Sequence, residues 1–304
     1  MTNDVLAEGP ETLTLTLSNP TGALPPPAGS FTLTINSDDA ADGPSPVADP
    51  AFNAQFFVRQ HYLDFLGRAP DASGANFWAG QTTGCGSADL LVCRINVSAS
   101  FFLSIEFQET GYLAYKTYGA AYGTRRVGNT VPLTLGEFLP DTQAIGAGVV
   151  VNQGDWRGLL ETNKQSYFGA FVSRPSFVER YPASMTAAQY VDALNANADG
   201  ALAAAERDNL VSRLEARQLD RAQVLRAVAE NATFTAREKN RAFVLMQYFG
   251  YLRRDPDAAP EPGLNFDGYN FWLGKLNEHN GNFVEAEMVK AFLDSIEYRR
   301  RFGQ

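Results

Sequence analysis

A segment of about fifty residues occurs twice in this chain, and this repeat constrains the fold more than any other feature. FVRQHYLDFL at 57–66 parallels FVLMQYFGYL at 243–252, and NFW stands at both 76–78 and 270–272. SFFLSIEFQETG at 100–111 parallels AFLDSIEYRRRFG at 291–303 in the same order. Units that complete one another's apolar faces are the basis of repeat architectures. We therefore expect a mainly α protein whose body is built from repeated helix–turn–helix units.

The first copy of the repeat begins with a helical pattern. Val58, Tyr62 and Phe65 share one helical face, and an adjoining apolar stripe widens it. Such a broad apolar surface is typical of a helix that is buried over much of its circumference. Gly67 follows, and glycine is the residue type that most often ends a helix.

The phrase LGRAPDASGANFW at 66–78 is expected to be scaffold rather than chemistry. Arg68 is placed to reach the C-terminal carbonyls of the first helix, and Asp71, after Pro70, is placed to cap the next one. Phe77 and Trp78 on that second helix are expected to pack back. Contact with a ligand is the alternative for these residues. In the second copy the corresponding residues are Asp255, Asp257, Phe271 and Trp272.

The rest of the body continues the helical pattern. Residues 98–123 are expected to form one helical stretch. YVDALNANADGALAAAERDNLVSRL at 190–214 and DRAQVLRAVAENATF at 220–234 follow the same helix–turn–helix–helix order without NFW, as a third, degraded copy. We divide the helical body into a first module at 52–182 and a second at 183–304.

The N-terminal residues predict a short antiparallel β-hairpin. TLTLTLS at 12–18 and FTLTIN at 31–36 alternate apolar and polar residues, with a turn-rich segment between them. We assign 1–39 to this hairpin and 40–51 to a linker rich in small, acidic and proline residues. An isolated hairpin is marginal in water. A partner sheet is therefore expected, or strand addition to a neighbouring chain.

Composition restricts the class of partner. A net charge of −9 argues against nucleic acid as a partner, because that would need a basic footprint. No run of 18 apolar residues exists, so membrane insertion is not expected. The start MTNDVLAEGPET lacks the features of a signal peptide. The protein is then either cytoplasmic or part of a longer chain, and the hairpin favours the second.

Few residues for catalysis or soft-metal binding are present. The two histidines stand outside any zinc-protease motif, and we expect His61 to be a packing residue and His279 to lie in a surface turn. Cys85 and Cys93 would form a disulfide in a secreted protein and would be free thiols in the cytosol. A tyrosine stripe is the remaining candidate, either for stacking on sugar rings or for the core; its members are Tyr112, Tyr115, Tyr118 and Tyr122.

One loop has the spacing of an EF-hand calcium site. NANADGALAAAE at 195–206 places Asn195, Asn197, Asp199 and Glu206 at ligand positions, although only two of them are carboxylates. The loop RRDPDAAPEPGLNFDGYN at 253–270 is a second acidic candidate. Turn and cap duties explain both loops without a metal.

The N-terminal segment resembles part of a known family. EGPETLTLTLSNPTGALPPPAGSFTLTINSDDA, from Glu8, is similar to the C-terminal half of a Calx-beta domain. Calx-beta domains are β-sandwiches of bacterial surface proteins and exchangers, and many bind calcium. The first half of the sandwich is absent from this sequence. The resemblance implies calcium as a possible cofactor, with the ligands Asp4, Glu8, Glu11, Asp38 and Asp39.

The helical body resembles a second family. YLDFLGRAPDASGANFW, RAQVLRAVAENATF and AFLDSIEYRRRFG are similar to the bacterial "domain of unknown function 4214", over residues 52–303. Members are small helical modules, often attached to secreted or surface proteins. The resemblance implies a non-enzymatic extracellular or cell-surface module that binds a surface protein or a glycan, with calcium as a possible aid. The alternatives are a polysaccharide-active enzyme with carboxylates in a groove between units, and a subunit of an assembly.

Overall fold

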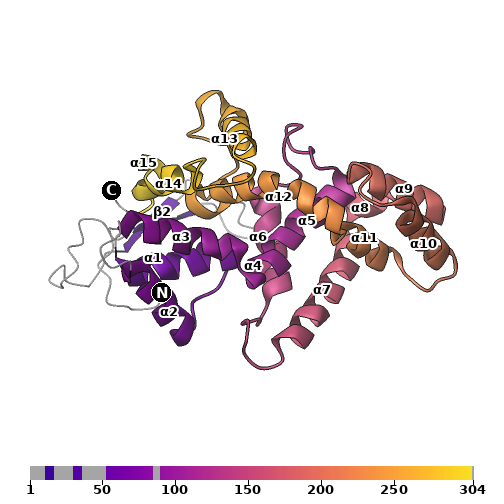
Figure 1. Ribbon diagram of the computed structural model, residues 1–304, viewed down its shortest axis with the longest axis horizontal. Coiled ribbons are helices and arrows are strands. Elements are labelled where there is room, and N and C mark those ends of the chain that lie inside the picture. Colours follow the sequence, from indigo (N-terminus) through magenta and orange to yellow (C-terminus); the bar gives the residue numbers. More distant parts are fainter. Residues whose placement is uncertain (1–10, 17–29, 36–52, 85–89, 303–304) are drawn as a thin grey trace, which may run out of the picture.

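The computed structural model describes residues 11–16, 30–35, 53–84 and 90–302. Over these residues the protein is mainly helical, with one short antiparallel β-hairpin near the N-terminus, as the sequence predicts. The helices form an elongated body, and helices from both ends of the chain lie together at one end of it (Figure 1). None of the described helices is both long enough and apolar enough to cross a membrane.

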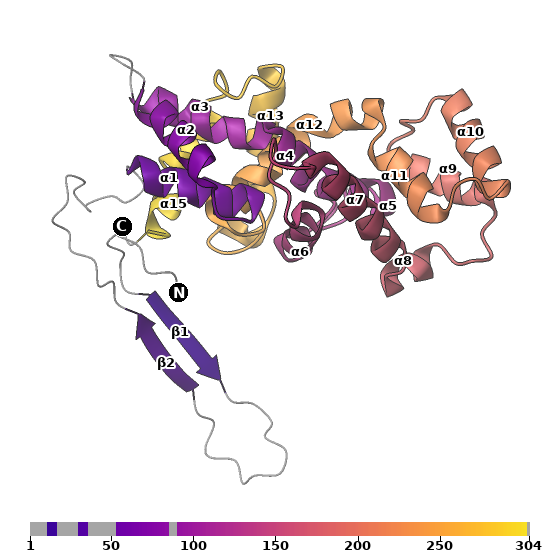
Figure 2. The ribbon, with the colours of Figure 1, turned by 90° about the horizontal axis from the view of Figure 1, so that it is seen from below.

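The hairpin has two antiparallel strands, β1 (Glu11–Thr16) and β2 (Ser30–Ile35). Leu13 lies opposite Leu33, and Leu15 lies opposite Phe31. Alternate residues of a strand point to the same face, so these four side chains share one face, and all four are exposed. Figure 2 shows the hairpin standing clear of the helical body. The described part of the chain therefore leaves the apolar face of the hairpin open.

The first copy of the repeat forms a helix with a π-helical last turn, followed by three more helices. In chain order the elements are α1 (Ala54–His61), η2 (Tyr62–Leu66), α2 (Ala72–Thr83), α3 (Leu90–Leu103) and α4 (Ile105–Glu109). The Asn53 side chain caps α1 by accepting a hydrogen bond from the Phe56 backbone N–H at 3.0 Å. Gly67 adopts a left-handed conformation, φ 67°, that ends the π-helical turn, which confirms the predicted stop.

The stretch 98–123, predicted to be helical, is helical but divided among three helices. The end of α3 and all of α4 precede α5 (Gly111–Tyr122). The Ser104 side chain caps α4 by accepting a hydrogen bond from the Phe107 N–H at 3.1 Å. A serine in this role favours a new helix start over continuation of the previous helix. The predicted helical stretch is therefore confirmed, with breaks before α4 and α5.

The middle of the chain packs around α5, whose residues 111–121 are all buried. The helices of this part are α6 (Leu135–Gly146), α7 (Trp156–Val172), α8 (Pro175–Arg180), α9 (Ala187–Asn197), α10 (Ala204–Glu215) and α11 (Arg221–Ala229). Of these, α6, α9 and α11 contact α5, and α10 packs on α9. The predicted helix–turn–helix–helix order of the third copy corresponds to α9, α10 and α11.

The second copy repeats the elements of the first, including the π-helical turn. The elements are α12 (Ala232–Gln247), η3 (Tyr248–Leu252), the 3₁₀ turn η4 (Pro262–Leu264), α13 (Asp267–Glu278), α14 (Met288–Leu293) and α15 (Ile296–Arg300). Arg253 takes the position of Gly67 and adopts the same left-handed conformation, φ 55°. The repeat seen in the sequence is therefore also a repeat of backbone structure.

The two copies pack directly against each other. Helix α3 contacts α14, and η2 contacts η3. The rings of Phe65 and Tyr251, one from each π-helical turn, lie 5.3 Å apart in a T-shaped arrangement. One connected core extends from Phe57 to Tyr298. Packing therefore crosses residues 182–183, where the sequence predicts a boundary between modules.

Candidate functional site

An arginine of the first copy fixes the turn between α1 and α2. Arg68 binds Glu106 through two hydrogen bonds, Nε to Oε1 at 2.6 Å and Nη2 to Oε2 at 2.7 Å. Its guanidinium lies 4.9 Å from the centroid of the Tyr62 ring. We call Tyr62, Arg68 and Glu106 the first clamp. Arg68 thus pairs with a carboxylate of α4 rather than with the carbonyls at the end of the first helix, which corrects the expectation.

The second copy contains the same arrangement, the second clamp, formed by Tyr248, Arg254 and Glu297. Arg254 donates to Glu297 at 2.6 and 3.1 Å and lies 5.3 Å from the Tyr248 ring centroid. A bidentate guanidinium–carboxylate pair is among the stronger and more directional polar contacts in proteins. The clamp is therefore a shared structural device of both copies.

The aspartates of the two turns have different duties. Asp71 caps α2 by accepting a hydrogen bond from the Gly74 N–H at 3.0 Å, as predicted. Its bonds with the Ser73 hydroxyl and with Gly74 lower the pKa of Asp71. Asp255 instead caps α6, accepting from the Leu135 N–H at 2.7 Å. The half-buried residues Pro70 and Asp257 also belong to the two turns.

The NFW motif divides its two aromatic residues between core and surface. The Trp78 ring packs 5.6 Å from Phe101, as predicted for the motif. Phe77, however, is 57% exposed, and Phe271 of the second copy is 55% exposed. The prediction that the phenylalanines pack back was therefore wrong. Adjacent helical positions face directions about 100° apart, so the tryptophan that packs against the core turns its neighbour outward.

A second exposed apolar residue accompanies each of these phenylalanines. Ile105 is 56% exposed and Ile296 is 68% exposed. Each follows a serine that caps a short helix, Ser104 for α4 and Ser295 for α15. We call Phe77 with Ile105 the first Phe–Ile pair, and Phe271 with Ile296 the second Phe–Ile pair.

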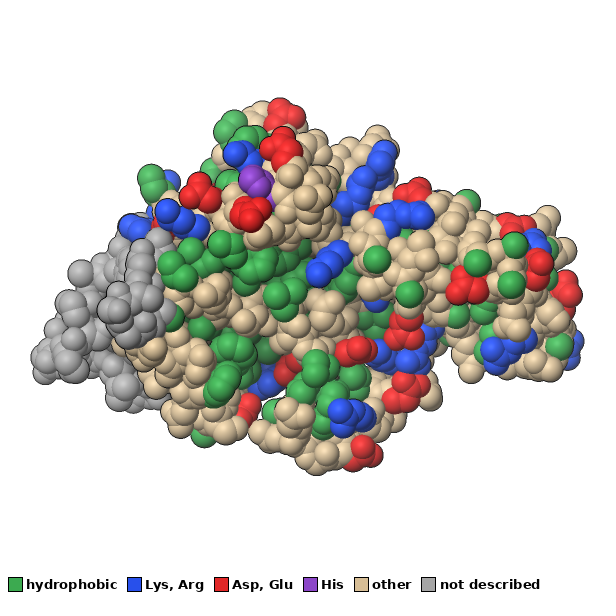
Figure 3. Space-filling model, viewed as in Figure 1, with side chains coloured by type: hydrophobic (Ala, Val, Ile, Leu, Met, Phe, Trp, Pro, Cys, Tyr) green, Lys and Arg blue, Asp and Glu red, His purple; other side chains and the backbone are tan. Residues whose placement is uncertain are grey.

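A groove of about 490 Å³ lies beside the first Phe–Ile pair. Its apolar side includes Trp78 and Phe101 together with the pair itself. The opposite side comes from the loop between α6 and α7, where Asn152 and Gln153 supply amide groups. Figure 3 shows hydrophobic side chains at this face and a notch between the α2 end of the body and the α6–α7 loop. The groove offers apolar contact with a polar rim.

A second pocket, of about 590 Å³, opens where α5 ends. Tyr118 and Tyr122 line it, but Tyr112 and Tyr115 lie in the core. Because three of the four tyrosines are buried, the predicted stripe is mainly a core feature. The remaining lining residues are Arg126, Glu137, Arg174, Ser176, Glu179 and Arg180.

A buried polar chain connects the two copies. His61 Nδ1 donates to the Phe57 carbonyl at 2.7 Å, so its Nε2 accepts a hydrogen bond from the Ser98 hydroxyl, also at 2.7 Å. The Tyr251 hydroxyl of the second copy binds Ser98 in turn. Burial lowers the pKa of His61 to about 3. The prediction of a packing histidine is confirmed, and the group stays neutral at physiological pH.

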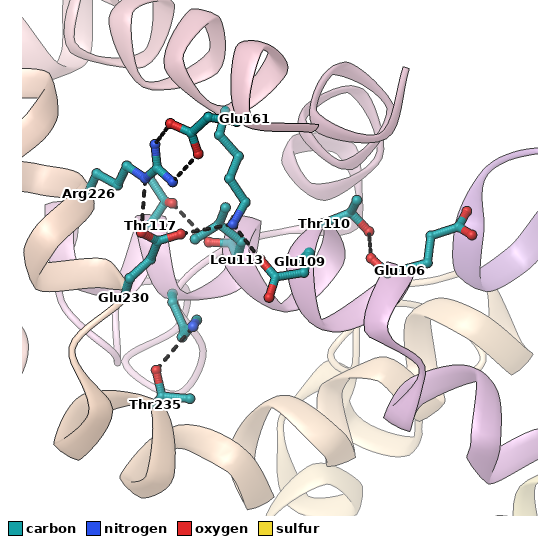
Figure 4. A network of polar contacts seen from close by, with 11 residues as sticks. Glu106, Glu109, Thr110, Leu113, Thr117, Glu161, Arg226, Glu230 and Thr235 are labelled. Atoms are coloured by element: carbon teal, nitrogen blue, oxygen red, sulfur yellow. Dashed lines mark hydrogen bonds and ion pairs between the residues drawn. The ribbon is translucent and has the colours of Figure 1, made fainter. Parts of the chain in front are cut away.

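A charged network joins α4, α7 and α11 in the middle of the body (Figure 4). Lys164, which is buried, forms ion pairs with Glu109 and Glu230, the latter at 2.9 Å. Arg226 binds Glu161 through two hydrogen bonds of 2.7 Å and also contacts Glu230. The charged groups of the network pair with one another within the body, so the network holds α4, α7 and α11 together.

A second buried lysine lies close to this network. Lys116 donates to the Thr235 hydroxyl at 3.0 Å and lies 4.8 Å from the Tyr112 ring centroid. Burial lowers its pKa to about 8. These contacts fasten α5 to α12.

Among the described residues, three carboxyl groups have a raised pKa, in each case because of burial. Asp64 is bound by Arg301, Glu238 accepts a hydrogen bond from Tyr115, and Asp255 caps α6. None of the three lines either pocket. Their positions fit structural roles.

The loop with EF-hand spacing uses its side chains for other contacts. Asn195 accepts from the Leu202 N–H at 2.9 Å, and Asn197 donates to the Ala121 carbonyl at 2.8 Å. Glu206 accepts from the Ala203 N–H at 2.8 Å, at the start of α10. Asp199 lies in the turn with a left-handed backbone, φ 53°. Among the described residues no cluster of three or more acidic, histidine or cysteine side chains has the geometry of a metal site.

Several predicted residues lie outside the described residues. These are Asp4, Glu8, Asp38, Asp39 and Cys85. Glu11 begins β1, but its side chain also lies outside them. The calcium ligands implied by the Calx-beta resemblance and the disulfide between Cys85 and Cys93 of α3 stay predictions.

The sequence analysis did not predict the two clamps or the exposed isoleucines, although a sequence signal for both was present. The string SIE occurs at 104–106 and again at 295–297. Its serine caps a helix, its isoleucine is exposed, and its glutamate completes the clamp. The repetition of an apolar residue directly after a cap could have indicated surface exposure.

Comparison with known proteins adds no relative. No family model, no curated protein and no solved structure matches this chain.

Proposed function

We propose that this protein is a non-enzymatic interaction module that binds a protein partner through its two Phe–Ile pairs. The observation that carries the proposal is exposure of the same two residues in both copies of the repeat. Scattered apolar residues on a surface need no explanation, but large ones at matched positions indicate a contact surface. Aromatic side chains are also enriched among the residues that dominate binding energy.

The surroundings of the pairs support this function. Trp78 and Trp272 are packed against phenylalanines of their own copies, and each clamp fixes the turn beside them. The exposed side chains therefore stand on rigid elements, which lowers the entropy lost on binding. The groove beside the first Phe–Ile pair adds a recess for an apolar side chain of the partner.

We further propose an extracellular or cell-surface setting for the module. The resemblances to Calx-beta domains and to domain of unknown function 4214 support this setting. The open apolar face of the hairpin suits strand addition by a neighbouring chain. Calcium assistance belongs to the same proposal and would act at the acidic N-terminal residues.

A polysaccharide-active enzyme is the alternative function. A general acid would require a carboxyl of raised pKa at a pocket. The carboxyls with raised pKa are engaged elsewhere. Glu137 does line a pocket, but its bonds with Arg126 and Thr134 outweigh burial and lower its pKa. The interaction module is therefore the better-supported function.

Site-specific photocrosslinking tests the proposal. A benzophenone amino acid is placed at position 77 or 271, and in a control at Val178, which is exposed but belongs to neither Phe–Ile pair. Each protein is irradiated with the surface fraction of the cells that produce it. We expect positions 77 and 271 to capture the same protein. Ile105→Ser should abolish capture at position 77, and Ile296→Ser should abolish capture at position 271.

The result that would reject the proposal is equal capture at position 178, or capture that does not change in the isoleucine variants. Loss of fold is a separate matter, which thermal unfolding of each variant checks. Exposed substitutions of this kind usually change stability by about 0.5 kcal/mol or less.

A further inference from the structure

The pocket at the end of α5 collects three arginines around two tyrosines. Tyr118 and Tyr122 come from the last turns of α5. Arg126 comes from the α5–α6 loop, Arg174 from the corner between α7 and α8, and Arg180 from the end of α8. Its volume of about 590 Å³ falls within the range of small-molecule sites, roughly 300–1,000 Å³. Neither Phe–Ile pair contributes to it.

Two of the arginines lie over aromatic rings. The Arg126 guanidinium lies 5.4 Å from the Tyr122 ring centroid and 5.6 Å from that of Tyr118. The Arg174 guanidinium lies 4.4 Å from the Phe171 ring centroid. Most donors of these two guanidiniums are used by contacts within the protein, but Arg126 Nη1 and Arg174 Nε have no hydrogen-bond partner among the described residues and remain available to an anion.

The arginines are fixed by contacts below the pocket. Arg174 donates to Asp141 at 2.9 and 2.5 Å and to the Tyr118 hydroxyl at 2.9 Å. Arg126 donates to the Pro132 carbonyl at 2.8 Å and pairs with Glu137. Groups held in place before binding lose little freedom when a ligand arrives.

The rim carries unmatched groups of both signs. Arg180 donates to the Asn197 side chain at 3.2 Å, and among the described residues no carboxylate lies within ion-pair distance of it. Glu179 is exposed beside it. The Ser176 hydroxyl, which contacts the Tyr122 hydroxyl at 3.0 Å, adds a further polar group.

We infer that this pocket binds an acidic sugar, a pyranose that carries a carboxylate. The arginine edges match the carboxylate, and the dispersed acceptors Glu137, Glu179 and Ser176 match several hydroxyl groups. Phosphate carries more negative charge than a carboxylate at neutral pH, so Glu137 and Glu179 would repel it more strongly. A neutral sugar would leave Arg180 without an anion, whereas Arg126 and Arg174 already pair with Glu137 and Asp141. A zwitterionic amino acid has one donor group, whereas the acceptors stand on two separate elements.

Heteronuclear NMR titration of the whole chain tests this inference with a panel of small ligands. Glucuronate is compared with glucose, acetate, glycine and inorganic phosphate, each added to the same protein at low salt. We expect glucuronate to shift the resonances of Tyr122, Ser176 and Arg180, with glucose and acetate at least about tenfold weaker. Equal binding of acetate and glucuronate would reduce the pocket to an anion site and overturn the inference, as would tighter binding of glycine or phosphate, or no shifts with glucuronate.

Two arginine variants provide the matched comparison. Arg180→Gln removes the unmatched cation and is expected to weaken glucuronate binding about tenfold, the effect of one charge-assisted hydrogen bond. Arg213→Gln on α10 removes an exposed arginine outside the pocket and should leave binding unchanged. Equal affinity of the Arg180 variant and the original protein would overturn the assignment. The inference is independent of the protein-binding proposal, because it uses no residue of either Phe–Ile pair.

Discussion

The two copies of the repeat are alike in their clamps and different where they meet. Asp64 of the first copy corresponds to Gly250 of the second. Asp64 receives hydrogen bonds from Arg301 at 3.0 and 2.9 Å, so the carboxylate of one copy binds the guanidinium of the other. Gly250 leaves room for the Phe65 ring of the first copy, which a Cβ atom would overlap. The clamp residues, which act within one copy, are the same in both copies, whereas the residues at the contact between the copies differ and are complementary.

The largest expected effect comes from breaking the charge contact between the copies. Asp64→Asn leaves Arg301 and the nearby Arg253 without their shared carboxylate. Removing one partner of a largely buried pair costs about 3 kcal/mol of unfolding free energy. Chemical denaturation at pH 7 measures this.

Leu63→Phe is the matched control. Leu63 precedes Asp64 in the chain, and the substitution introduces the residue that stands at the corresponding position of the second copy, Phe249. Leu63 is exposed, so we expect a change of about 0.5 kcal/mol or less. A loss in Asp64→Asn no larger than that of the control would mean that the contact contributes little.

The close packing of Gly250 against the Phe65 ring predicts that alanine at position 250 destabilises the protein, the reverse of the usual effect of this substitution in a helix. Replacement of a helical glycine by alanine normally stabilises a protein by about 1 kcal/mol. Gly250→Ala should instead lower the unfolding free energy by about 2 kcal/mol, because the added methyl group meets the Phe65 ring. Gly169→Ala in α7, where the added carbon meets open space, is the control and should stabilise. Stabilisation by both substitutions would disprove the close fit of the copies.

The sequence predicted features that depend on neighbouring residues. The cap by Asp71 and the stop at Gly67 each involve residues within a few positions, and both are present. The clamp partner of Arg68 lies 38 residues away, and that of Arg254 lies 43 residues away. No local pattern fixes which carboxylate such an arginine will meet.

The candidate site was harder to predict than the fold for a related reason. NFW has the aromatic composition of a core motif, but only the backbone geometry decides that Trp78 is packed and Phe77 exposed. The pocket at the end of α5 combines residues from separate elements, and the sequence singled out only two of its lining residues, Tyr118 and Tyr122, as members of the tyrosine stripe. Surfaces formed by several elements follow from packing rather than from any one segment.

The copies also differ at His61, which corresponds to Gln247. The folded-state pKa of His61 is about 3, below its ordinary value of 6.5, so the unfolded chain binds more protons between these values. Stability from this group is therefore complete above pH 6.5 and is lost as the pH falls towards 3. The loss amounts to about 2 kcal/mol at pH 5.

His61→Gln should abolish this component of the pH dependence. Gln247 donates to the Phe243 carbonyl at 2.9 Å, as His61 does to Phe57, so glutamine fits the position. Its free oxygen would accept from Ser98, a partner that Gln247 lacks among the described residues, because Val289 stands at the position of Ser98. Denaturation midpoints at pH 7 and pH 5 measure the difference. The same decline in both proteins would assign the acid sensitivity to other groups.

The smallest expected effect is the difference in stability between a substitution in the first clamp and the same substitution in the second clamp. Arg68 adds one carbonyl contact to its pair with Glu106, whereas Arg254 also donates to Glu261 at 3.0 Å and to three carbonyls of its longer turn. Lysine keeps the charge but cannot form these bidentate contacts. Arg68→Lys should therefore cost about 1 kcal/mol and Arg254→Lys about 2 kcal/mol, measured by denaturation.

The order of these two values decides what the clamp is for. If it only closes a turn, the longer turn of the second copy needs more bonds, and Arg254 must matter more. A larger loss in Arg68→Lys would instead indicate that the first clamp supports the groove beside Phe77, since Arg68 and Glu106 both line that groove. Crosslinking at position 77 in the Arg68→Lys protein would then fall together with stability, and at position 271 it would not.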